Sequence, residues 1–186
     1  MLSEDVIDEI TTYVRSGFYE SDHLTRIFCE EMYAPGELSI EEVRAAINTA
    51  FSEWEEEKKS WGDTTDCDRL DDAFAALNAK GIIAIQNAGF TQSDGYDDFL
   101  EAYERSTDKS AVLGYCYYHG QDLERAVRGG GLFLAFGPAV AAEEESKGPE
   151  IGRIVQEELE RVGLGVVWDG SFAKRISIPD FDWKKR

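Results

Sequence analysis

Cysteine and histidine are scarce in this chain of 186 residues, which contains three cysteines and two histidines. The cysteines, Cys29, Cys67 and Cys116, are far apart in the sequence and include no C-x-x-C pair. Such spacing supports neither a disulfide framework nor the ligand set of a structural zinc site. We therefore expect reduced thiols in a cytoplasmic protein that holds no metal and no other cofactor.

Positive charge is also scarce, because 19 lysines and arginines stand against 38 aspartates and glutamates, giving a formal net charge of −19. The negative field of such a chain repels the phosphate backbone of nucleic acids, so we expect no direct nucleic-acid binding. The acidic excess is concentrated in residues 1–72, which contain 20 acidic and 6 basic side chains. This acidic segment would suit a basic protein partner.

Long hydrophobic runs are missing as well. The longest apolar run, Gly131 to Ala142, is interrupted by Gly137 and Pro138 and is too short to cross a bilayer. Residues 1–5 lack the basic segment that begins a secretion signal. We expect no association with a membrane, and these features again favour the cytoplasm.

The first third of the chain has the apolar spacing of helices, and we expect residues 1–62 to form an acidic helical segment. Apolar side chains recur every three or four positions over residues 4–16, and a second helix opens at Ser21. Ser39 and Glu42 have the spacing of a capping box, which predicts the start of a third helix.

The remaining residues, 63–186, are expected to form an α/β domain. The short apolar runs 82–85, 112–118 and 132–136 predict buried strands, and helical patterns alternate with them. Residues 141–149 have the composition of a charged loop, and a helix is expected to start near Ile151.

The end of the chain predicts a β-hairpin. Residues 164–168 and 174–178 have the composition of strands, and Asp169-Gly170-Ser171 between them is a turn sequence. With the three earlier strands this gives an α+β fold with α/β features, in which a mixed sheet of about five strands is covered by helices.

The densest group of functional side chains lies where the second strand meets the next helix, at His119, Gln121 and Asp122. A histidine titrates near neutral pH, and Asp122 could orient its ring from the next helical turn. The alternation of a strand places Tyr115 and Tyr117 on the same face as His119. The alternative is purely structural, with Asp122 capping the helix and His119 bonded to a backbone carbonyl.

Two further segments supply candidate ligand-binding residues. The polar loop after the first strand contributes four of them, Gln86, Asn87, Gln92 and Asp94. If the first two strands are parallel neighbours, this loop borders the crevice at the carboxyl ends of the strands, where open α/β sheets bind ligands. In the expected hairpin, Trp168 and Asp169 could form a binding edge, although an apolar anchor and a turn residue explain them equally well.

Several short motifs occur in order along the chain. They are Trp61 with 65–74, then 114–122, then 131–137, and finally 168–170 with Trp183. Together they resemble an uncharacterised bacterial family of unknown function, over nearly the whole chain. The resemblance implies no activity and no catalytic residues. Some members of that family have a cysteine cluster in the loop corresponding to residues 86–95, which implies a metal, but this chain has no cysteine there.

Two classes of function follow from these observations. The first is an acidic protein-binding or regulatory module in the cytoplasm, which the charge of residues 1–72 favours. The alternative is a protein that binds a polar small molecule, or a small enzyme, with its site around His119. The local sequence places no Ser, Cys or Lys nucleophile beside His119, so we favour a role other than catalysis. A third possibility is a structural role without any pocket.

Overall fold

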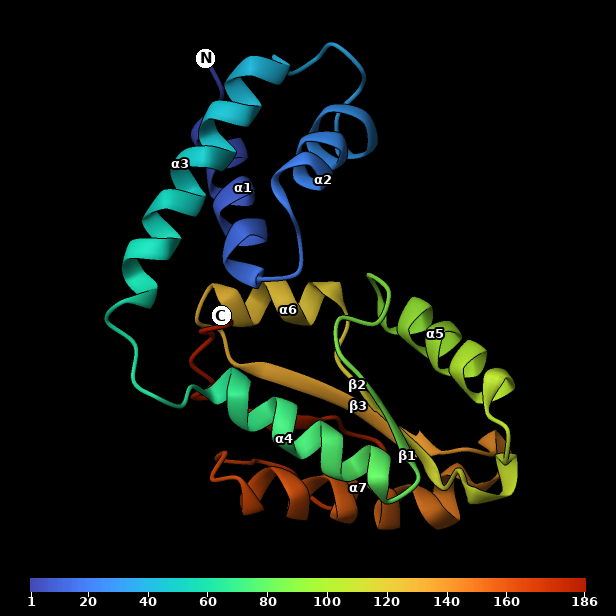
Figure 1. Cartoon of the computed structure of the whole chain (residues 1–186). Helices are drawn as coiled ribbons and strands as arrows, with labels where there is room; N and C mark the ends of the chain where they lie inside the picture. The colour runs from blue at the N-terminus through green and yellow to red at the C-terminus, as the bar shows by residue number, and fades with distance from the viewer. The chain divides into compact units, whose positions relative to one another are not determined.

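The computed structural model describes all residues from 1 to 186, and the chain divides into two compact units (Figure 1). The first unit comprises residues 1–65 together with the last three residues, 184–186. The second unit comprises residues 66–183 and contains the whole sheet. The mixed α+β fold expected from the sequence is confirmed.

The first unit is helical. Its α-helices are α1 (Glu4–Ser16), α2 (Ser21–Arg26), which continues into a π-helical segment (Ile27–Met32), and α3 (Ile40–Lys58). The predicted bounds of α1 are confirmed, and the hydroxyl of Ser39 accepts a hydrogen bond from the Glu42 amide at the start of α3, as a cap should. Ile10, Phe28 and Ile47 are fully buried between these helices. No helix anywhere in the chain combines the length and the apolar composition that crossing a membrane requires.

The second unit begins with helix and strand in alternation. Its elements are α4 (Asp66–Ala79), β1 (Ile82–Ile85), α5 (Gln92–Arg105), β2 (Gly114–Tyr117), α6 (Gly120–Val127), β3 (Leu132–Pro138), α7 (Glu144–Arg161) and β4 (Ile176–Ile178). The strand predicted at residues 82–85 is confirmed with its exact bounds. Strands β2 and β3 also lie where they were expected, with ends shifted by one or two residues.

The four strands form one sheet in the order β1-β2-β3-β4. Strand β1 is parallel to β2, whereas β2 and β3, and then β3 and β4, are antiparallel. Tyr117 on β2 lies opposite Ala135 on β3, and Leu134 on β3 lies opposite Ile176 on β4. If the second register is continued by one residue, Arg175 follows Ala135 and Tyr117 in one row across the sheet.

The two faces of the sheet are covered to different extents. Helices α4 and α7 pack together and cover one face, where Cys116 and Tyr118 are fully buried (Figure 1). On the other face, α5 covers β1 and α6 covers one end of β3. We call this second face, which carries Tyr115, Tyr117 and Ala135, the open face of the sheet.

Two expectations need correction. The predicted hairpin is reduced to one antiparallel bridge between Val167 and Ser177, so the sheet has four strands, and β4 pairs mainly with β3. The expected loop at residues 141–149 contains the first turns of α7, and Pro149 lies inside that helix. The helix persists through Pro149 because tertiary packing holds it: Gly148 is buried under the ring of Phe172.

Candidate functional site

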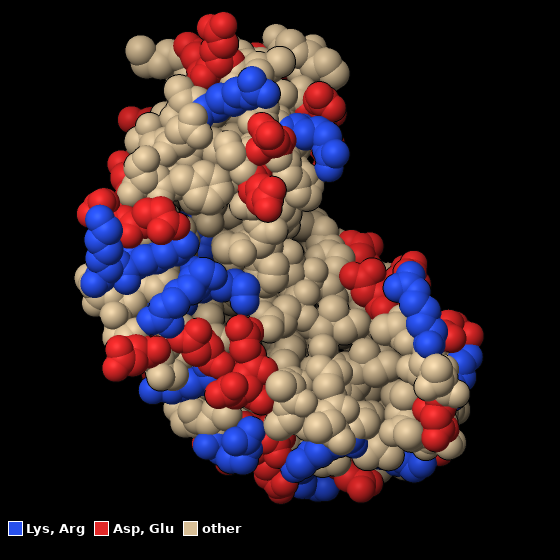
Figure 2. Space-filling view, in the orientation of Figure 1, with Lys and Arg blue, Asp and Glu red and all other residues tan.

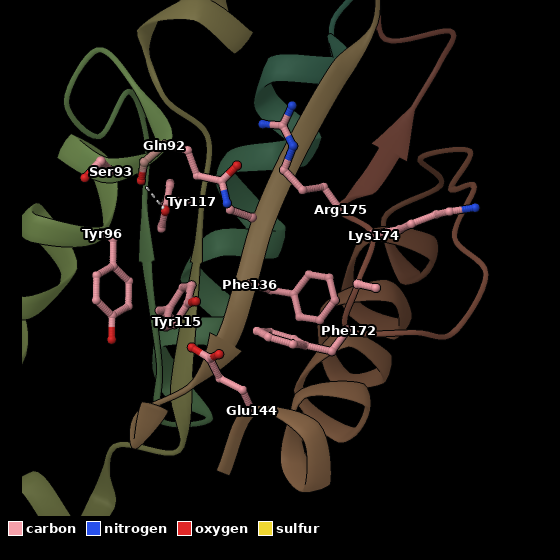
Figure 3. Close-up of a pocket in the computed structure, with 12 residues that line it drawn as sticks. Gln92, Ser93, Tyr96, Tyr115, Tyr117, Phe136, Glu144, Phe172, Lys174 and Arg175 are labelled. Atoms are coloured by element: carbon pink, nitrogen blue, oxygen red, sulfur yellow. Dashed lines mark hydrogen bonds between the residues drawn. The ribbon is translucent and has the colours of Figure 1, made fainter. Parts of the chain in front are cut away.

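The open face of the sheet contains a cavity of about 760 Å³ (Figure 3). Its floor is formed by Tyr115 and Tyr117 of β2 and by Ala135 of β3. The first turn of α5 lines one side, and the segment 172–175 before β4 lines the other. The cavity exists because β3 presents small side chains to this part of the face, at Ala135 and Gly137, while Phe133, farther along the same face, lies outside the lining.

The two tyrosines of the floor are fixed in place. Their rings stack with centroids 5.7 Å apart, and the Tyr115 ring lies over Gly137, where a Cβ atom would come within 2.6 Å of its hydroxyl oxygen. The Tyr117 hydroxyl donates to the carbonyl oxygen of Gln92 at 2.7 Å, which ties the first turn of α5 to the sheet. Burial raises the pKa of Tyr117 to about 12 and also raises that of Tyr115, so both hydroxyls stay protonated and can donate hydrogen bonds.

The wall opposite α5 is residues 172–175, the end of a segment, 168–175, that two aromatic rings anchor to α7. The Trp168 ring packs against Gly152, and the Phe172 ring packs against Gly148, one helical turn away. The indole N–H of Trp168 donates to the carbonyl oxygens of Ser171 and Lys174, at 2.9 and 3.1 Å. These contacts shape the loop that carries Lys174 and Arg175 to the cavity.

Asp169 has a structural role in that loop. Its carboxylate accepts from the backbone N–H and the hydroxyl of Ser171, at 2.9 and 2.7 Å, and lies 3.2 Å from the Lys174 ammonium group. Trp168 therefore packs on α7 and Asp169 holds the loop together, and neither residue lines the cavity.

Behind the wall lies a buried cluster of three charged or titratable side chains, His119, Asp122 and Arg175. Nη1 of Arg175 donates to both carboxylate oxygens of Asp122, at 3.0 and 2.9 Å. Nε2 of His119 lies 3.0 Å from Oδ2 of Asp122 and 3.2 Å from Nη1 of Arg175. His119 and Asp122 are only 4% and 3% exposed, whereas Arg175 lines the cavity. We call these residues the His119–Asp122–Arg175 cluster.

The environment of His119 favours the neutral imidazole. Burial lowers the pKa of the ring, Asp122 opposes this effect, Arg175 adds to it, and the nearby Phe90 carbonyl and Asp94 act in the same direction as Asp122. The ring atom Nδ1 is buried and has no hydrogen-bond partner. The Asp122 carboxylate also faces the backbone N–H of His119 at 3.4 Å, as the cap of α6.

The crevice expected between the ends of β1 and β2 is closed. The loop after β1 is joined to the start of α6 by backbone hydrogen bonds, from Gly120 to Gly89 at 3.0 Å and from Gln121 to Phe90 at 3.2 Å. Because the two loops are bonded edge to edge, no ligand can enter between them. The cavity lies on the face of the sheet instead.

The structure therefore places the candidate binding residues of that loop at different positions, and only one of them lines the cavity. Gln92 lines the cavity, whereas Asp94 caps α5 by accepting from the backbone N–H and the hydroxyl of Thr91, which lower its pKa. Gln86 accepts from the Tyr118 hydroxyl at 3.0 Å, so it belongs to the opposite face of the sheet. Asn87 takes a left-handed backbone conformation with φ of 49°, which marks it as a turn residue. Gln121 is exposed and does not line the cavity.

Sequence reasoning missed the charged residues of the cavity, Arg175, Lys174 and Glu144. One available signal was the alternation in Arg175-Ile176-Ser177-Ile178, which puts Arg175 on the face opposite the two buried isoleucines. Glu144 could not be placed because its segment was expected to be a loop. No group of three or more His, Cys, Asp or Glu side chains is arranged to hold a metal ion.

Comparison with known proteins identifies the family of this chain but no individual similar protein. The model of one protein family, described as "Domain of unknown function (DUF6891)", matches residues 2–186. This confirms the uncharacterised family expected from the sequence motifs. A search of curated proteins and a search of solved structures each gave no match.

Proposed function

Because the chain belongs to this family of unknown function, we propose a function from the chemistry of the site: the protein binds a small polar molecule in the cavity on the open face. An anionic group of that molecule is bound by Arg175. The proposal follows the alternative drawn from the sequence, with the site moved from His119 itself to the cavity that the His119–Asp122–Arg175 cluster borders.

The observation that carries the proposal is the state of the Arg175 guanidinium. Asp122 and His119 contact only Nη1, so Nε and Nη2 keep their donors for another partner. The side chain is 33% exposed and lines the cavity. A guanidinium held from behind by a buried carboxylate is pre-organised, and its planar donors match the geometry of a carboxylate or phosphate.

The other lining groups support small-molecule binding. The Tyr115 hydroxyl and the side-chain amide of Gln92 offer hydrogen bonds, and the aromatic rings of Tyr115 and Phe172 offer apolar contact (Figure 3). Ligand pockets typically combine an apolar lining with a few convergent polar groups in this way. The His119 ring does not line the cavity, so we assign it a role in positioning Arg175 and none as a catalytic base.

The proposal is tested with a simple carboxylate probe. Hexanoate is titrated into the full chain, and binding is followed by NMR shifts of the Tyr117 and Ala135 amides. We expect Arg175→Lys to weaken binding about tenfold, because lysine keeps the charge and loses the forked donors. The matched control is Arg105→Lys, because Arg105 is an exposed arginine of α5 that pairs with Glu101 and does not line the cavity. This variant should bind hexanoate with the affinity of the wild type.

Two outcomes would contradict the proposal. One is the absence of any hexanoate-dependent shift at the floor of the cavity. The other is an equal affinity in the wild type and Arg175→Lys, which would mean that Arg175 does not contact the anion.

The other function predicted from the sequence is binding of a basic protein partner by the acidic surface of the first unit, and the structure adds no observation in its favour. Three consecutive glutamates near the end of α3 are paired within that unit: Glu55 with Lys58, Glu56 with Lys59, and Glu57 with Arg15. In the view of Figure 2, Lys and Arg side chains lie among the Asp and Glu side chains. Such pairing reduces the local negative field, so docking of a basic protein partner, like the cytoplasmic location, stays a prediction from the sequence.

A further inference from the structure

The cavity contains a carboxylate that the proposed function does not use. Glu144 is the first residue of α7, it is half-buried, and it lines the cavity. Figure 3 shows its carboxylate pointing into the cavity toward Tyr115. After the effect of burial, the charge of Glu144 also contributes to the raised pKa of both Tyr115 and Tyr96. Glu144 is therefore close to the tyrosine floor.

Glu144 has no cationic partner within the chain. The lysine that follows it, Lys147, pairs with Glu143 at 2.8 Å, and the lysine across the cavity, Lys174, pairs with Asp169 at 3.2 Å. The Glu144 carboxylate is therefore available to a cation from outside the chain.

The positive and negative groups lie at different ends of the cavity. Arg175 is beside Tyr117, whose pKa it lowers against the effect of burial, and Glu144 is beside Tyr115. Tyr115 and Tyr117 are two residues apart on β2, which corresponds to about 6.6 Å along a strand. The aromatic rings of Tyr115, Phe136 and Phe172 lie between the two charged ends (Figure 3).

We infer that the ligand is a zwitterion with separated charges, such as an ω-amino acid, whose anionic group binds Arg175 and whose ammonium group binds Glu144. This inference rests on the proposed function, since it assumes that Arg175 holds the anion. The rings around Glu144 support it, because an ammonium group is attracted both by a carboxylate and by the faces of aromatic rings. A short aliphatic chain would lie over the tyrosine floor.

The same geometry discriminates against other classes of anion. A dicarboxylate would place its second negative charge against Glu144, and this repulsion would reject it. An α-amino acid carries its two charges on adjacent carbons, so it cannot reach both ends of the cavity at once. The inference therefore predicts a dependence on chain length as well as on charge.

The test compares ligands that differ only in the ammonium group or in length. Hexanoate, 6-aminohexanoate, adipate and 2-aminohexanoate are titrated into the full chain, and affinities are measured by NMR or calorimetry. We expect the wild type to bind 6-aminohexanoate about tenfold more tightly than hexanoate, and adipate more weakly than hexanoate. We also expect 2-aminohexanoate to lose the advantage of its amine.

The decisive variant is Glu144→Gln, with Glu145→Gln as its matched control. Glu145 is the next residue in the same helical turn, is exposed, and does not line the cavity. In Glu144→Gln the preference for 6-aminohexanoate over hexanoate should disappear, while hexanoate binds at least as well as before. Glu145→Gln should keep the wild-type preference.

The results separate the two proposals. If the wild type binds hexanoate and 6-aminohexanoate equally, or if Glu144→Gln keeps the preference, the inference is wrong and the proposed function stands. If none of the four compounds binds, both are wrong. Stronger binding of adipate than of hexanoate would also overturn the inference.

Discussion

Asp122 and Arg175 are 53 residues apart in the sequence, and Nη1 of Arg175 donates to both carboxylate oxygens of Asp122, at 3.0 and 2.9 Å. The contact joins the first turn of α6 to the residue just before β4. It connects a buried carboxylate to a guanidinium that lines the cavity. We therefore expect stability and the proposed binding to be coupled at this pair.

Replacing Asp122 with Asn should destabilise the protein by about 1–3 kcal/mol, because it removes a buried ion pair and weakens the cap of α6. The range is below that of a fully buried pair, since Arg175 is partly exposed. Urea denaturation measures the change. Asp169→Asn, in the exposed pair with Lys174, should cost less than about 1 kcal/mol. Equal losses in the two variants would contradict the role given to Asp122.

The stability of the protein should fall as the pH is lowered below about 6.5, the ordinary pKa of histidine. The pKa of His119 is lower in the folded state, chiefly because of burial, so the unfolded chain binds the proton more readily over this range. The contribution of the neutral ring is complete above the ordinary pKa and is lost as the pH falls through the pKa of the folded state.

Thermal unfolding of the wild type and His119→Asn across the pH range isolates this effect. The difference in the free energy of unfolding between the two should shrink toward acidic pH. The matched control is His23→Asn, which removes the only other histidine, an exposed one in the first unit. A constant difference between wild type and His119→Asn at all pH values would show that His119 does not titrate differently on folding.

Replacing Trp168 with Ala should cost about 2–3 kcal/mol, because the ring packs on Gly152 and Phe136 although it is only half-buried. The variant also loses the two hydrogen bonds that shape the segment before Arg175. We therefore expect weaker binding of hexanoate as well, measured by NMR under conditions where the variant is folded. A fully stable variant that still binds normally would show that the loop does not depend on Trp168.

Local patterns determined most of the elements. The apolar periodicity of residues 4–16 and the apolar run 82–85 each specify one structure without help from distant residues, and both were predicted with exact bounds. The faces of β2 followed from alternation in the same way, so Tyr115 and Tyr117 were correctly expected on one side. These predictions depend only on backbone geometry.

The errors arose where distant contacts decide the outcome. Strand β4 pairs with β3 because of packing that no local pattern encodes, so the hairpin was predicted in place of that pairing. The helical turns before Pro149 are held by Phe172, which lies more than twenty residues later in the chain. The cavity was missed for the same reason, since Glu144 and Arg175 meet the floor only after both segments are placed.

The small side chains at Ala135 and Gly137 have a consequence for how this sequence can change. A larger residue at position 135 would fill the space above the floor, bury more apolar surface and thereby tend to raise the melting temperature. Selection for robustness alone would therefore tend to close the open face. The alanine at position 135 therefore leaves some stability unrealised and leaves the space above the floor open.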